Sequence, residues 1–153
     1  MYIKNALILF FILITGSLFS QITIDDVGDG WKLKVDSALT LIKNITPDYY
    51  KEVSEYCKHV TYWMGGFSTT QDSSVVVISV RDMKIGSVNN IACIIVHESH
   101  HLAIQKKHIV MIPKKEELEC YQYEYEFLQR IPNVEDWLTI HAIKNIINNK
   151  PTD

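Results

Sequence analysis

The chain has 153 residues, of which 47% are hydrophobic and 22% charged, and this composition fits one globular domain. It excludes collagen-like, low-complexity and broadly disordered chains. The formal net charge is −3, from 15 Lys and Arg against 18 Asp and Glu, so no basic excess indicates binding to nucleic acid.

Residues 1–20 have the layout of a secretory signal peptide. Lys4 is the only charge, residues 6–14 are wholly apolar, and small residues follow. We expect cleavage after Ser20, with Ser17 as the second choice and an uncleaved membrane anchor as the alternative. Residues 21–153 then form one exported domain, periplasmic or secreted, with 14 basic and 18 acidic residues because Lys4 is removed.

The three cysteines are too few for a disulfide scaffold. In an exported protein two of them could pair and leave one free, or all could be buried thiols. The sequence leaves both possibilities open for Cys57, Cys93 and Cys120.

Five helices are predicted after an irregular lead-in over residues 21–32. Apolar residues at helical spacing predict the first helix over 35–45. Pro47, with Thr46 as N-cap, begins the second, which runs to about residue 59. Ser87 or Asn89 can cap a long helix over 90–107. Helices over 114–130 and 134–147 complete the chain, separated by a proline at position 132.

The clearest strand signal is the β-branched run from Ser74 to Val80. Residues 60–64 are its expected hairpin partner, and residues 68–74 are expected to form a polar turn between them. Charged residues after Val80 would end the strand. The predicted fold class is therefore α+β, a small sheet or hairpin packed on the long helix, with several helices in a single domain.

The long helix contains the pattern H-E-x-x-H at His97, Glu98 and His101. Residues four apart lie about one turn apart on the same helix face, so the two imidazoles can share one tetrahedral zinc ion. Glu98 is rotated to the side of that face, where it can take a proton from the attacking water without binding the metal. The residue types and their spacing thus favour metal-assisted hydrolysis.

A third protein ligand is expected from the next helix, which carries five glutamates. Helical phase at about 100° per residue places Glu117 near the middle of an apolar arc formed by Leu118, Tyr121, Tyr125 and Leu128. A carboxylate there is costly unless it is paired or metal-bound, so Glu117 is the favoured ligand. The other candidates stay open: Glu124 shares the inner face, Glu116 lies at its margin and Glu119 faces water.

The two motifs, residues 97–101 and 117–121, resemble the gluzincin pattern, and in particular small single-domain zinc metallopeptidases of bacteria and phage. In those proteins the second helix reads roughly E-x-x-A-Y, with Cys120 here in place of Ala. The resemblance covers about residues 65–131. It implies Zn²⁺ bound by His97, His101 and Glu117, with Glu98 as the general base or acid.

The interpretation is a zinc-dependent metallopeptidase that acts on a peptide or protein substrate, with no nucleic-acid partner and with a membrane association only if the N-terminal segment is uncleaved. The alternatives are a non-catalytic, zinc-stabilised interaction domain and an exported helper protein whose histidines are incidental. An edge strand beside the helix would hold substrate as an added strand, and Ser74–Val80 is either that edge or an interior strand. The candidate oxyanion donors are Tyr121, Tyr123, His100, His108 and His141.

Overall fold

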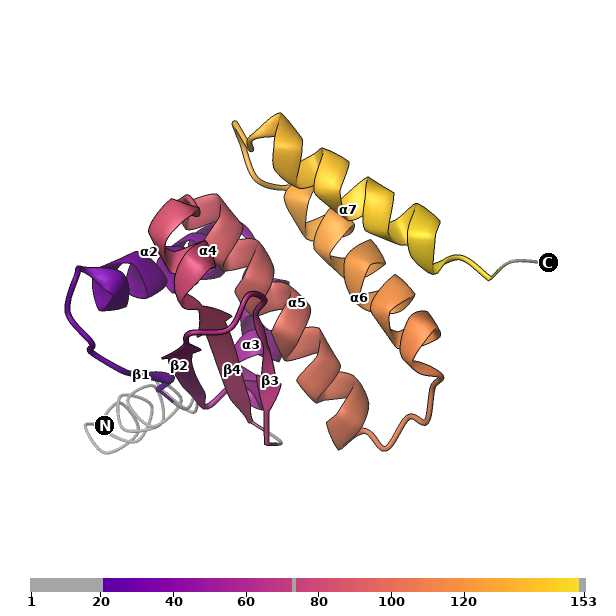
Figure 1. The fold of residues 1–153 in the computed structure, drawn as a ribbon, viewed down its shortest axis with the longest axis horizontal. Helices are drawn as coiled ribbons and strands as arrows, with labels where there is room; N and C mark the ends of the chain where they lie inside the picture. Colours follow the sequence, from indigo (N-terminus) through magenta and orange to yellow (C-terminus); the bar gives the residue numbers. More distant parts are fainter. Residues whose placement is uncertain (1–20, 73, 152–153) are drawn as a thin grey trace, which may run out of the picture.

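The structure is a computed structural model that describes residues 21–72 and 74–151, and the predicted signal peptide at residues 1–20 lies outside them. In chain order the elements are β1 (Thr23–Ile24), α2 (Trp31–Ile45), α3 (Pro47–Tyr56), β2 (His59–Trp63), β3 (Thr69–Gln71), β4 (Val75–Ser79), α4 (Val80–Ile85), α5 (Val88–Lys106), α6 (Pro113–Leu128) and α7 (Asp136–Asn149) (Figure 1). This arrangement confirms the predicted α+β class in a single small domain.

The sheet has the order β1-β2-β4-β3. Strands β2 and β4 pair in parallel, from His59 opposite Val75 to Trp63 opposite Ser79, so the expected hairpin between them is wrong. The hairpin partner of β4 is instead β3, which pairs with it antiparallel. Strand β3 was not predicted, because its polar residues are typical of a turn. An edge strand with one solvated face nevertheless tolerates polar residues such as Thr69 and Thr70.

Strand β4 is interior, because β2 and β3 flank it on its two sides. Its residues are largely buried, as the continuous β-branched run predicted. The possibility that this strand forms the sheet edge beside the long helix is therefore wrong. That edge belongs to β3, which packs against α5.

Helix α5 is the central element of the domain. It packs against α2, α3, α4, the sheet and α6, and α7 packs on the outer side of α6 (Figure 1). Thirteen of its nineteen residues are buried, because the helix is surrounded on most sides. Ser87 caps it by accepting a hydrogen bond from the backbone N–H of Asn90 at 3.1 Å, which decides between the two predicted caps.

A short helix that the sequence analysis did not predict follows β4. Ser79 ends the strand and serves as N-cap of α4, because its hydroxyl accepts a hydrogen bond from the N–H of Asp82 at 3.0 Å. The Asp82 carboxylate in turn accepts hydrogen bonds from the hydroxyls of Ser79 and Ser68. These contacts turn the chain away from the sheet and toward the start of α5.

The core lies between the sheet and helices α2, α3 and α5 and extends to α6 and α7. Its buried apolar residues on α2 are those whose spacing predicted the helix: Val35, Ala38, Leu39 and Ile42. All three cysteines are buried and unpaired in the structure. Among residues 21–72 and 74–151, no helix combines the length and apolar character needed to cross a membrane.

Candidate metal centre

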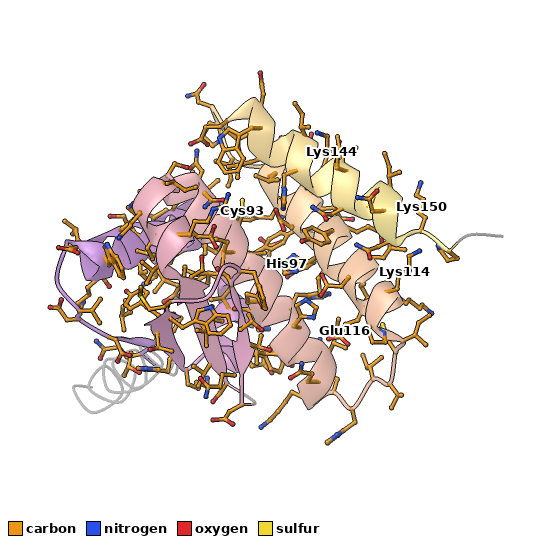
Figure 2. All side chains as sticks on the ribbon, viewed as in Figure 1. Cys93, His97, Lys114, Glu116, Lys144 and Lys150 are labelled. Carbon is orange, nitrogen blue, oxygen red and sulfur yellow. The ribbon has the colours of Figure 1, made fainter. Side chains whose placement is uncertain are left out.

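Two histidines of α5 face α6 across the packed pair of helices. His97 and His101 lie one turn apart, both buried, and their Nε2 atoms are 3.2 Å apart. Figure 2 shows His97 and Glu116 in the space between α5 and α6, which run antiparallel. The predicted juxtaposition of the two imidazoles on one face is thus present.

Glu117 reaches the same point from α6. Its carboxylate oxygens lie 3.7 Å from Nε2 of His97 and 3.4 Å from Nε2 of His101. Ligands bound to tetrahedral zinc at about 2.0–2.2 Å are about 3.3–3.6 Å from one another. The three separations are close to that spacing, with a different oxygen of Glu117 facing each imidazole. Within the described residues, His97, His101 and Glu117 form a group that could hold a metal ion, since one ligand atom of each lies within 4.8 Å of the others.

The other nitrogen of each imidazole is fixed by a carboxylate of α6. Nδ1–H of His97 donates to Glu124 at 3.0 Å, and Nδ1–H of His101 donates to Glu116 at 2.8 Å. Such bonds select the tautomer that leaves Nε2 free to bind a metal and hold the ring in place. Both imidazoles are therefore oriented toward the common point before any ion binds.

Glu98 lies beside the cluster without joining it. Its side chain is buried and borders the cleft together with His97. Burial raises the pKa of Glu98, while the neighbouring imidazoles of His97 and His101 oppose that rise. A carboxylate with a raised pKa beside a metal position is suited to accept and return a proton.

The cluster is rich in carboxylates. Four carboxylates (Glu98, Glu116, Glu117 and Glu124) surround two imidazoles, and among the described residues no Lys or Arg forms an ion pair with them. Burial lowers the pKa of His97, but its hydrogen bonds to Glu117 and Glu124 outweigh burial and raise that pKa to about 10. Hydrogen bonds from His101 and His97 hold the pKa of the Glu117 carboxylate far below its usual range. In the absence of a metal, protons on the two imidazoles supply the positive charge of the cluster.

Two cavities meet at the cluster. The larger, of about 660 Å³, extends toward α4 and α7, and the smaller, of about 390 Å³, extends toward β3 and the start of α6. His97, Glu98 and Tyr121 border both cavities. The cluster thus lies where the two cavities adjoin.

Glu117 meets the imidazoles but is not the buried acid that helical phase predicted. Its side chain is 43% exposed, whereas that of Glu124 is 7% exposed. The buried side chains of α6 are those of Cys120, Glu124, Phe127 and Leu128, so the core-facing direction passes closer to Glu124. The predicted apolar arc was centred on Glu117 because it counted Tyr121 and Tyr125 as buried, but both side chains are only partly buried. This partial exposure places Glu117 at the mouth of the cleft.

The structure separates the remaining candidates. Glu119 lies 3.8 Å from His100 and does not reach the imidazoles of His97 and His101, which disfavours it as the third candidate ligand. Of the five candidate oxyanion donors, Tyr121 and His141 line the cleft. His100 and Tyr123 stack on each other outside it, with ring centroids 4.0 Å apart. Glu116 as partner of His101 was missed, because its marginal helical phase gives no sign of what lies opposite.

Comparisons of the chain with family models, with curated proteins and with solved structures gave no match. The resemblance to the gluzincins therefore depends on the two short motifs. What the structure adds to those motifs is the meeting of His97, His101 and Glu117 at one point beside Glu98.

Proposed function

We propose that this protein is a zinc-dependent metallopeptidase in which His97, His101 and Glu117 hold the ion and Glu98 acts as general base. The observation that carries the proposal is the convergence of three side chains in an open cleft. The Nε2 atoms of His97 and His101 are 3.2 Å apart, and one oxygen of Glu117 lies 3.7 Å from Nε2 of His97 while the other lies 3.4 Å from Nε2 of His101. A purely structural zinc site is usually closed by four protein ligands. Three ligands with a half-exposed third favour a catalytic site.

A zinc ion bound here would lower the pKa of a coordinated water and polarise the scissile carbonyl group. Glu98 accepts the proton of the attacking water and then donates it to the leaving amine. Because the Glu98 carboxylate is buried, its pKa is raised and return of the proton is favoured. Glu124 and Glu116 keep the two imidazoles oriented throughout.

A peptide substrate fits the cleft beside β3. This strand is the edge of the sheet, and Thr69 and Thr70 line the smaller cavity together with Glu98 and Glu117. An extended peptide can add to such an edge through main-chain hydrogen bonds. This mode of binding would carry the scissile bond past the metal position, and Tyr121 and His141 are then the candidates to stabilise the developing oxyanion.

The test is the substitution Glu98→Gln, assayed by mass spectrometry on a mixture of peptides of varied sequence, with the zinc content measured in parallel. Loss of the general base should reduce turnover about 10²–10⁴-fold and leave one zinc ion per chain. Glu119→Gln is the matched control, because this carboxylate lies on α6 but outside the ligand cluster. Undiminished turnover in Glu98→Gln would contradict the proposal. Full zinc occupancy with no turnover in either form would favour the non-catalytic, zinc-stabilised domain instead.

A further inference from the structure

The loop that joins α5 to α6 exposes apolar side chains to solvent. It forms a corner of the molecule at the lower right of Figure 1. Val110 is 96% exposed, Ile112 69% and Ile109 43%. Residues 106–115 read Lys-Lys-His-Ile-Val-Met-Ile-Pro-Lys-Lys, so two lysine pairs enclose the apolar tip. We call this segment the lysine-flanked loop.

Both ends of the lysine-flanked loop are fixed by helix-capping geometry. The N–H of His108 donates to the carbonyl of Gln105 at 3.0 Å, and the N–H of Ile109 donates to that of Ile104 at 3.2 Å. With His108 in the left-handed region at φ 54°, these bonds form the Schellman motif that ends α5. Pro113 starts α6 at the other end. The apolar tip is therefore held outward between two helix ends.

The charge around the tip is positive on a protein that is acidic overall. Lys106, Lys114 and Lys115 are exposed, and none of them forms an ion pair within the described part of the chain. Lys107 lies 3.8 Å from Glu52, at the margin of ion pairing. The nearest carboxylate in sequence, Glu116, is bound to His101. Lys106, Lys114 and Lys115 are thus free to bind an anionic surface.

We propose that the lysine-flanked loop docks this protein on an anionic lipid bilayer. Val110, Ile112 and Ile109 enter the interface, while the flanking lysines contact headgroup phosphates. A lipid surface fits better than a protein partner because the tip is convex and carries only four apolar residues, a shape that a soft interface accommodates without a matching pocket. Lysine stems also extend readily from an apolar boundary toward phosphate groups.

Docking through this loop would bring the cleft close to the membrane. Pro113 lines the smaller cavity together with His101 and Glu117, so the metal position lies next to the loop. On the proposed peptidase function, the substrates would then be peptide segments at the bilayer surface. The lipid binding itself is independent of that function, since it needs neither zinc nor Glu98.

The first experiment labels the full-length chain with an environment-sensitive fluorophore at Val110→Cys. The native thiols of Cys57, Cys93 and Cys120 are buried, and burial raises their pKa, so the introduced thiol reacts selectively. Vesicles of phosphatidylglycerol and phosphatidylcholine should shift the emission to the blue and raise it severalfold, whereas phosphatidylcholine alone should not. A label at Met64→Cys, 87% exposed on another loop, should not respond.

An unchanged emission at position 110, or an equal response at position 64 or with neutral vesicles, would overturn the proposal. A response to soluble polyglutamate but not to vesicles would assign the loop to an acidic protein partner instead.

The second experiment measures the strength of vesicle binding. Replacing Lys106 and Lys115 by Gln should weaken partition about 25-fold, since each lysine near an anionic surface contributes roughly a factor of five. The matched control replaces Lys144 on α7 and Lys150 at its C-cap by Gln, and it should change little. Equal partition of the two double variants would contradict a docking role. His97→Ala should bind vesicles like the unchanged chain, since its partner Glu124 lies away from the loop. Failure of the zinc proposal would therefore leave this result standing.

Discussion

Helix α5 carries two histidine–carboxylate clusters on different faces, and they differ in what the imidazoles meet. His97 and His101 face α6 and direct both Nε2 atoms to one point with Glu117. His100 faces α3, where its Nδ1–H donates to Glu52 at 2.8 Å and its ring stacks on Tyr123. The three histidines lie within five residues, yet only two of them converge.

The difference lies in the charges that accompany each cluster. Around His100, Lys107 lies 3.8 Å from Glu52 and Tyr123 donates to the same carboxylate, so that cluster holds its own cation. Around His97 and His101 the described residues provide carboxylates but no Lys or Arg ion pair. The negative charge around His100 is thus balanced by a cation of the protein, and this cluster joins α5 to α3. The negative charge around His97 and His101 has no such partner, and a divalent cation could balance it.

The largest expected effect separates these two faces directly. His97→Ala and His101→Ala should each weaken zinc binding by more than about 100-fold, because a direct ligand is lost. His100→Ala should keep one zinc ion per chain and instead lower stability by about 1–3 kcal/mol, since Glu52 loses the hydrogen bond from Nδ1–H and Tyr123 loses the ring stacked on it. Zinc content after purification without chelator and thermal unfolding measure the two outcomes. Loss of zinc in His100→Ala would contradict the assignment of His100 to a structural rather than a metal-binding role.

The carboxylates that orient the imidazoles should have the next largest effect. Glu124→Gln and Glu116→Gln should each weaken zinc binding about 10–100-fold, because the ring they hold becomes mobile and less basic. Glu52→Gln is the matched control and should leave the zinc affinity unchanged. Competition titration with a chromogenic chelator measures the affinities. Equal affinities in all three variants would show that Glu124 and Glu116 do not act on the metal position.

The zinc affinity should rise with pH by up to tenfold per unit for each proton released. Burial lowers the pKa of His97, but Glu117 and Glu124 raise it to about 10, so the metal-free protein keeps a proton that zinc must displace. Because this folded-state pKa lies above the usual 6.5, the stability that it contributes is full below pH 6.5 and lost as the pH rises toward 10. Chelated protein should therefore lose stability over that range while zinc-loaded protein does not. A zinc affinity independent of pH between 6.5 and 9 would contradict the geometry.

The smallest effect is expected at Glu119, the glutamate that lies on α6 but at the wrong face. Its side chain is 42% exposed and lies 3.8 Å from His100. An exposed pair of this kind contributes little, so Glu119→Gln should change stability by less than about 1 kcal/mol and leave zinc binding unaltered. Chemical denaturation with and without zinc measures both. A loss of zinc would make Glu119 a ligand in place of Glu117.

The juxtaposition of His97 and His101 was predictable because its geometry is local. The spacing of His97 and His101 fixes them on one helix face whatever surrounds the helix. Glu117 was selected on the correct helix but for the wrong reason. The buried face of α6 lies nearer Glu124 than Glu117. The pairing of Glu116 with His101 depends on how two antiparallel helices are aligned, which one helix alone does not specify.

The sheet was less predictable because strand pairing is decided between distant segments. The strand β4 was predicted from its β-branched residues. Its parallel pairing with β2 was not, because the chain between them forms the edge strand β3, which takes the antiparallel place beside β4. Polar side chains made β3 look like a turn, since an edge strand needs apolar residues on one face at most. Helix α4 was hidden by its brevity, because six residues give too little periodicity to detect.

The most direct test of the account is anomalous diffraction at the zinc absorption edge from crystals of protein purified without chelator. The account predicts one peak per chain between α5 and α6, with Nε2 of His97, Nε2 of His101 and an oxygen of Glu117 at about 2.0–2.2 Å. Absence of that peak, or a zinc ion held by His100 or another set of residues, would contradict it.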